Sequence, residues 1–248
     1  MKATRKRKVR KRNGGGRKTK GVRKSGVSAT SGEDSTSRQI LLEVARKEFA
    51  RNGLHGSRVD KIAKQAKINK QLIYYYFGAK ENLYLAVLEE VYRDIRAHEH
   101  ALDLRALDPI AAMRKLVVFT FDYVMENRDF VLLLTNENLM EARHLKRSKI
   151  IKATHSPIVD LLADTLARGE KENLFRSGID PVQLYISLAG LCFFYTANIH
   201  TLTILFDRDL LSQDAVMERR LHVVDFVIGY LTKTPPATQH VSSSSFPL

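Results

Sequence analysis

Two short amphipathic segments joined by a tight turn, at residues 59–66 and 69–77, constrain the fold of this chain more than any other feature. Apolar side chains in the first segment recur at the spacing that places them on one face of a helix. They are Val59, Ile62, Ala63 and Ala66. In the second segment, Ile73 and Phe77 repeat one helical turn apart. Each segment predicts a helix with one buried face, and together they predict a helix-turn-helix.

Capping residues indicate where both helices begin. Ser57, followed by Asp60 three residues later, has the pattern of a capping box before the first helix. Asn69 is suited to the start of the second helix, because its side-chain oxygen can accept from the N–H groups of the first turn.

The face of the second helix opposite Ile73 and Phe77 carries side chains that can contact DNA. Lysine can donate to guanine, and glutamine can pair with adenine through two hydrogen bonds. We therefore expect Lys70 and Gln71 to face base edges, whereas Tyr74 and a lysine reach phosphate. The residues of this region predicted to contact DNA are Arg58, Asn69, Lys70, Gln71, Tyr74, Tyr75 and Lys80.

The run from Ile68 to Leu83 resembles the DNA-binding region of the TetR family of bacterial transcriptional regulators. The resemblance extends upstream through Ile40, Leu41, Ala45, Phe49 and Gly53, which match that family's first helix and its glycine stop. It implies a ligand-responsive repressor that works as a homodimer on a palindromic operator in double-stranded DNA.

Three positions depart from the family pattern. Lys67 stands where the turn usually has glycine, and a left-handed lysine costs roughly 1 kcal/mol. Leu72 replaces a small polar residue, so that one DNA contact is missing. Ala79 replaces a serine cap, which weakens the start of the following helix by about 1 kcal/mol.

A basic tail precedes the first helix. Residues 1–26 hold thirteen Lys or Arg residues and no acid, so they carry almost all of the formal charge of +14. With little to bury, this segment is expected to be disordered and to contact phosphates through residues such as Arg23 and Lys24. A solvated tail and a nuclear localisation signal are the alternatives. The apolar middle segment of a secretory signal is missing.

The rest of the chain carries helical patterns and no convincing strand pattern. After a linker at residues 30–37, a first helix is expected to end near Asn52, and a long amphipathic helix from Lys80 to about His98 connects two domains. Further helices are predicted at residues 109–124, 130–140, 150–168, 181–206 and 212–231.

Residues 181–206 contain no Asp, Glu, Lys or Arg and are long enough to cross a bilayer. Polar residues such as Gln183, Asn198 and His200 would make a lone membrane span costly. We therefore expect no membrane association, and a helix that packs into the core on one side and into a subunit interface on the other.

The second half resembles the ligand-binding domain of one TetR subgroup, less closely than the first half. The matching runs are 136–139, 145–148, 180–181 and 193–202. The resemblance implies an effector pocket and a dimer made by the last two helices, and we expect an aromatic or heteroaromatic effector. The expected pocket residues are Phe119, Tyr123, Asn136, Asn138, Phe194, Tyr195, Asn198 and His200.

The sequence gives little support for catalysis or for a cofactor. Cys192 is the only cysteine and is expected in the core, and no histidine spacing suits a metal. An enzyme would require Glu137, His144 and His200 to converge in one cavity. We predict neither a cofactor nor a metal.

These patterns predict an all-α protein with a basic tail at 1–34, a helix-turn-helix domain at 35–84, an effector-binding and dimerisation domain at 85–234 and a second tail at 235–248. The expected function is a cytoplasmic, nucleoid-associated repressor that an effector releases from DNA. An activator or a constitutive DNA binder is the alternative. A second alternative, of another functional class, is an interaction protein that uses its basic tail on nucleic acid without an effector.

Overall fold

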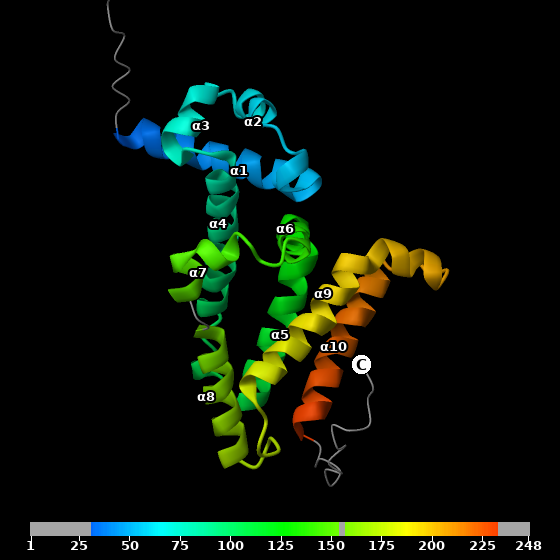
Figure 1. Cartoon of the computed structure of the whole chain (residues 1–248). Helices are drawn as coiled ribbons and strands as arrows, with labels where there is room; N and C mark the ends of the chain where they lie inside the picture. The colour runs from blue at the N-terminus through cyan, green and yellow to red at the C-terminus, as the bar shows by residue number, and fades with distance from the viewer. Residues whose placement is uncertain (1–30, 154–156, 233–248) are drawn as a thin grey trace, which may run out of the picture.

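The computed structural model describes residues 31–153 and 157–232, and Figure 1 shows them as helices throughout. Ten α-helices and two short 3₁₀ turns, η1 and η2, make up the described part of the chain, where no strand occurs. The predicted all-α class is therefore confirmed. Residues 1–30 and 233–248, with most of both predicted tails and with Arg23 and Lys24, lie outside the described residues.

The small domain consists of α1 (Ser31–Gly56), α2 (Val59–Ala66) and α3 (Lys70–Phe77), at the top of Figure 1. The predicted inner faces of α2 and α3 are buried against α1, where Phe49 has no exposed surface. Helix α1 is broken at Gly53, whose backbone has φ 63°, so regular helix ends where the glycine stop was predicted. Its start differs, because the expected linker at 30–37 is helical from Ser31 onward.

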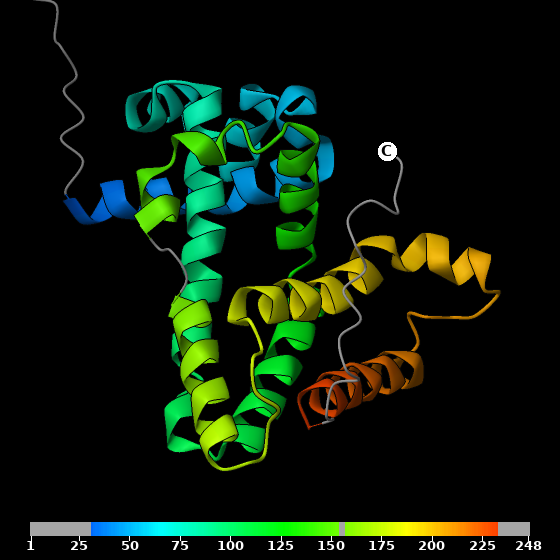
Figure 2. The same ribbon diagram turned by 60° about the horizontal axis from the view of Figure 1, so that its bottom comes forward.

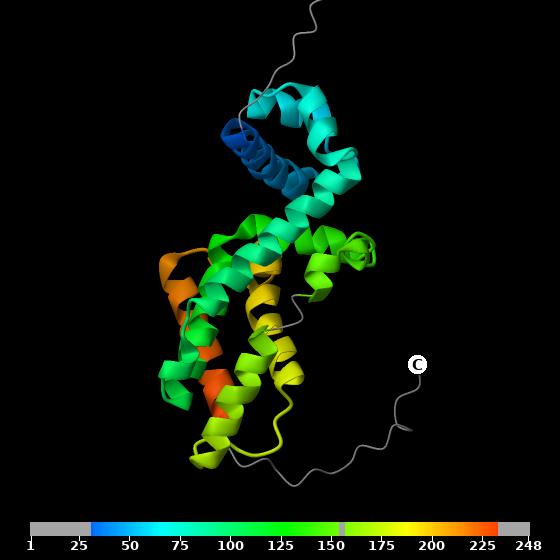
Figure 3. The same ribbon diagram turned by 90° about the vertical axis from the view of Figure 1, so that its left-hand side faces the viewer.

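Helix α4 (Lys80–His100) joins the small domain to the large one, as Figure 3 shows. Its start at Ala79 has no side-chain cap, as predicted. Leu83, Val87 and Leu88 are buried at its upper end, and Ile95 is buried lower down. One continuous helix thus belongs to the cores of both domains.

The large domain is built from the remaining helices. These are η1 (Leu104–Ala106), α5 (Pro109–Glu126), α6 (Arg128–Leu139), η2 (Leu145–Arg147), α7 (Lys149–Ala153), α8 (Pro157–Lys171), α9 (Pro181–Leu205) and α10 (Gln213–Thr232). Asp180 caps α9 and Ser212 caps α10, both as predicted. The segment predicted as a single helix at 150–168 contains α7 and α8, on either side of residues 154–156, which lie outside the described residues.

Helices α9 and α10 lie at one side of the molecule, and the end of α9 extends outward in Figure 2. Among the described helices, α9 alone is long and apolar enough to cross a membrane. Its inner face, with Leu188 and Cys192, is buried in the core. Its outer face exposes Ile186 and Phe194 by 56% and 59%. One face therefore belongs to the core, as expected, and the other is apolar and is not covered by any of residues 31–153 and 157–232.

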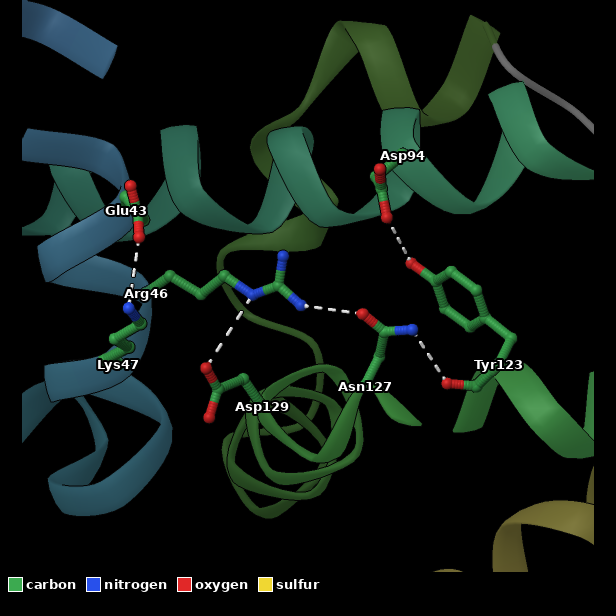
Figure 4. A network of polar contacts seen from close by, with 7 residues as sticks. All are labelled: Glu43, Arg46, Lys47, Asp94, Tyr123, Asn127 and Asp129. Atoms are coloured by element: carbon green, nitrogen blue, oxygen red, sulfur yellow. Dashed lines mark hydrogen bonds and ion pairs between the residues drawn. The ribbon is translucent and has the colours of Figure 1, made fainter. Parts of the chain in front are cut away.

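Helix α6 links the large domain to the small one, because it packs on α1 as extensively as α4 does. Asn136 of α6 donates to the Ala50 carbonyl, 3.4 Å away. Figure 4 shows a second link, in which Arg46 of α1 donates to Asn127 and faces Asp129. Two domains in contact through α4 and α6 can transmit a displacement of either helix to α1.

Candidate nucleic-acid interface

Helices α2 and α3 form the core of the candidate interface. Asn69 caps α3 as predicted, since its side-chain oxygen accepts from Gln71 N at 2.9 Å. Lys67 closes α2 in the left-handed conformation, with φ 55° and ψ 34°. The predicted strain at Lys67 is therefore present, and the turn forms despite it.

The capping box predicted for α2 is wrong. The Ser57 hydroxyl donates instead to the carbonyls of Gly53, at 2.6 Å, and Glu48, at 3.2 Å. The break at Gly53 brings Ser57 back beside the end of α1, where its hydroxyl reaches both carbonyls. Arg58 occupies the N-cap of α2 with no side-chain cap, so its guanidinium is not committed to the helix end.

The arc of α3 that is predicted to face DNA is exposed, as its periodicity requires. Ile73 and Phe77 are 1% and 8% exposed, whereas Tyr74 and Tyr75 are 46% and 74% exposed. Gln71 is also exposed on this arc. The exposed side chains supply the donors, acceptors and aromatic rings that a DNA groove can bind.

Lys70 is positioned by a residue of α2. Its ammonium lies 2.7 Å from Asp60 and 5.9 Å from the centroid of the Tyr74 ring. The hydrogen bond between the two side chains lowers the pKa of Asp60 and raises the pKa of Lys70. Both groups stay charged at neutral pH. The sequence assigned Asp60 to a cap, and only the packing of α2 on α3 reveals this role.

Two contacts hold α3, the predicted recognition helix, and its neighbours in place. The Tyr76 hydroxyl donates to Asp34 near the start of α1, at 2.6 Å. Lys80 donates to the Ser57 carbonyl at 3.2 Å, which ties the start of α4 to the start of α2. Asp34 gave no sequence signal, because it lies 42 residues from Tyr76.

The exposed face of α2 adds cations that the sequence analysis did not select. Lys61, Lys64 and Lys67 are exposed, beside the predicted Arg58. Lys61 pairs with the buried Glu48 at 2.8 Å. Lys64 and Lys67 border the turn itself, and a search for cations opposite the apolar stripe of α2 would have found Lys64.

The eight residues expected to form an effector pocket are not brought together. Tyr123 donates to Asp94 of α4 at 2.7 Å, as Figure 4 shows, and its ring and that of Phe119 pack beside His98. Asn136 contacts α1, and Asn138 bonds its own helix at Leu134.

The four expected pocket residues of α9 do not share one face, because Tyr195 is 6% exposed in the core and Phe194 is 59% exposed. Tyr195 donates to the Leu210 carbonyl and lines, with Phe194, a hollow of about 590 Å³ between α9 and α10. Asn198 donates to the Phe194 carbonyl, and His200 contacts Arg128 on the surface. The structure does not bring these side chains together, because they occupy different faces of three helices, and their role in effector binding stays a prediction.

Of the three residues considered for catalysis, two lie together and the third lies elsewhere. Glu137 is 1% exposed and bonds the Nδ1 of His144 at 3.0 Å, together with the N–H groups of His144 and Leu145. His200 lies elsewhere, beside Arg128. Cys192 is buried as predicted, and burial raises the pKa of its thiol to about 12. In the described residues no group of His, Cys, Asp and Glu suits a metal ion.

The fold and the exposed face of α3 define a helix-turn-helix DNA-binding protein. Residues 41–87 match the family described as bacterial regulatory proteins, tetR family, and residues 109–227 match the tetracyclin repressor-like C-terminal domain. The chain is 35% identical over 212 residues to the HTH-type transcriptional repressor NicS of Pseudomonas putida, covering 86% of this chain and 99% of NicS. The chain belongs to the TetR family.

More distant relatives agree with this assignment. The regulator RutR of Escherichia coli is 38% identical over 74 residues, which are 30% of this chain and 32% of RutR. The solved structure of the transcriptional regulator SCO4942 from Streptomyces coelicolor has a TM-score of 0.58 and 27% identity, covering 79% of this chain and 98% of that one. The protein is a transcriptional repressor of the TetR family that binds DNA through its helix-turn-helix, not an enzyme. Such a regulator acts in the cytoplasm.

Proposed function

We propose that this repressor binds a palindromic operator as a homodimer and is released by a small aromatic or heteroaromatic effector. The observation that carries the proposal is α4, which has one end beside α3 and the other in the large domain. A ligand that displaces the lower part of α4 changes the position of the recognition helix. In this proposal the protein works at the nucleoid and controls genes for the breakdown of the effector.

The dimer in this proposal is formed by α9 and α10. Both helices expose apolar side chains on their outer faces, including Ile186, Phe194, Leu221 and Phe226, each more than half exposed. A contiguous apolar surface of this kind is typical of an association site. Two-fold symmetry would then present two copies of α3 to two half-sites one helical turn apart or a multiple of it.

The proposal is tested by first identifying the operator and then dissociating the complex of protein and operator with candidate effectors. Binding-site selection should return a palindrome, and a thermal-shift screen of aromatic and heterocyclic acids should identify compounds that raise the melting temperature. The same compounds should dissociate the operator complex in a mobility-shift assay. Stabilising compounds that tighten the complex would contradict release, and would favour an activator or a corepressor-dependent protein.

A further inference from the structure

A cavity of about 350 Å³ lies at the end of α4 that is remote from the DNA-binding domain. Its walls come from the last turns of α4, from η1 and from the first turn of α8. The apolar part of the wall consists of Leu104, Ile158 and Leu161. An engineered cavity of about 150 Å³ can hold benzene, so this one has room for a one-ring compound with polar substituents.

The wall of this cavity contains a buried ion pair on α4. Arg96 Nη1 lies 2.5 Å from Glu99 Oε2, and the two side chains are 18% and 7% exposed. Tyr185 of α9 is close enough to act on the guanidinium electrostatically. Taking both charges out of water is costly, and their attraction offsets this cost only in part. A buried arginine at a cavity wall is therefore a strong site for an anion that enters the cavity.

A neighbouring ion pair on the same helix shows which property distinguishes Arg96 and Glu99. Arg93 and Glu90 are also three residues apart and 2.6 Å from one another, but their side chains are 57% and 33% exposed. Water screens such a pair and leaves little net attraction. Burial, and not the pairing itself, distinguishes Arg96 and Glu99.

We propose that the cavity is the effector site and that the effector is a small aromatic carboxylate, whose carboxylate binds Arg96 in the place of Glu99. This inference rests on the proposed release by an effector. Arginine favours a carboxylate because its planar fork donates two parallel hydrogen bonds. Glu99 already places a carboxylate beside Arg96. The carboxylate of the effector would make the same kind of contact with Arg96.

The displaced Glu99 must become neutral if the site is to keep its charge balance. Burial raises the pKa of Glu99, although the neighbouring Arg96 lowers it. Protonation of Glu99 on binding leaves one cation and one anion in the site, as before. The other titratable or charged groups facing it are His100 on α4, Asp103 and Arg105 on and beside η1, Tyr123 on α5, Asp160 on α8 and Tyr185 on α9.

A bound ligand at this position touches α4 directly. Arg96, Glu99 and His100 are on its final turns, and the same helix begins at Lys80 beside the recognition helix. The opposite wall is held firmly, because Arg168 of α8 donates to the carbonyls of Leu104 and Leu107. Filling the cavity therefore shifts the end of α4 in preference to η1.

Calorimetric titration with benzoate, other aromatic and heteroaromatic monocarboxylates, benzamide and benzylamine tests the proposal. At least one monocarboxylate should bind about tenfold or more tightly than its neutral amide. Arg96→Gln should weaken that binding by about ten- to a hundredfold, and the matched Arg93→Gln should leave it unchanged. Equal binding of acid and amide, tighter binding of benzylamine, or the same affinity in Arg96→Gln would overturn the site.

The pH dependence gives an independent readout, which holds even if Arg96→Gln fails to fold. Uptake of one proton predicts that affinity falls about tenfold per pH unit above the pKa of Glu99. Glu99→Gln should remove this slope and bind the carboxylate more tightly, while a slope due to His100 would persist. An unchanged slope in Glu99→Gln contradicts the exchange. Operator release is measured in parallel: carboxylate binding without release refutes the proposed function alone, whereas release that does not depend on Arg96 refutes this site alone.

Discussion

At the scale of single residues, the interface combines side chains that read DNA with side chains that hold them in place. Gln71 is exposed and its side chain forms no hydrogen bond to the described part of the chain, whereas Lys80 is tied to the Ser57 carbonyl. We expect Gln71→Ala to cost about 1–3 kcal/mol on the preferred operator and to relax one base position, because glutamine distinguishes adenine. Lys80→Ala should weaken binding to all sequences alike. Binding-site selection on both variants provides the measurement, and an unchanged preferred site for Gln71→Ala contradicts the assignment.

At the scale of secondary-structure elements, the end of α8 is fixed by a glycine against an aromatic ring. A Cβ at Gly169 would lie 2.0 Å from Phe175 Cδ2, and Phe175 is 5% exposed. Gly169→Ala should therefore destabilise the protein by about 1–3 kcal/mol, because a packed core resists added volume. Urea unfolding measures the change. Gly56→Ala is the control, since its Cβ would lie 3.4 Å from Asn52 and no closer. If Gly169→Ala and the control are equally stable, the packing of Phe175 on Gly169 does not fix the end of α8.

At the scale of the whole molecule, the outer faces of α9 and α10 decide the oligomeric state. Phe226→Glu places a charge at the centre of an apolar surface and should convert the proposed dimer into a folded monomer. Operator affinity should fall by about tenfold or more, because one half-site contact is lost. Sedimentation velocity and circular dichroism provide the measurement. Leu139→Glu, at an apolar side chain of α6 that is 80% exposed, is the matched control and should remain dimeric. A dimeric Phe226→Glu variant places the interface elsewhere.

The basic tail also acts at this scale, since it adds thirteen cations to a chain that is otherwise close to neutral. Deletion of residues 1–24 should leave the fold and the dimer intact and reduce operator affinity. The slope of log affinity against log salt should become shallower, because fewer counterions are released. The same slope with and without these residues means that the tail does not touch DNA.

The sequence by itself determined most of the helices and the exposed and buried faces of α3. Helical periodicity is a local property, and it correctly separated Ile73 and Phe77 from Gln71 and Tyr74. The Asn69 cap and the glycine stop at Gly53 are equally local, because each depends on backbone groups within one helical turn. The resemblance of residues 40–83 to the TetR family rests on this same local pattern.

Only the tertiary structure decided which side chains share a site. The Ser57 hydroxyl turned back to carbonyls of α1, and Asp60 reached Lys70 across the turn, because the packing of three helices sets those distances. The expected pocket residues separated for the same reason: their helices cross at angles that no periodicity encodes. Arg96 and Glu99 are about one helical turn apart in the sequence, like Arg93 and Glu90. The burial of the Arg96 and Glu99 pair beside a cavity depends on η1, α8 and α9, which lie far from it along the chain.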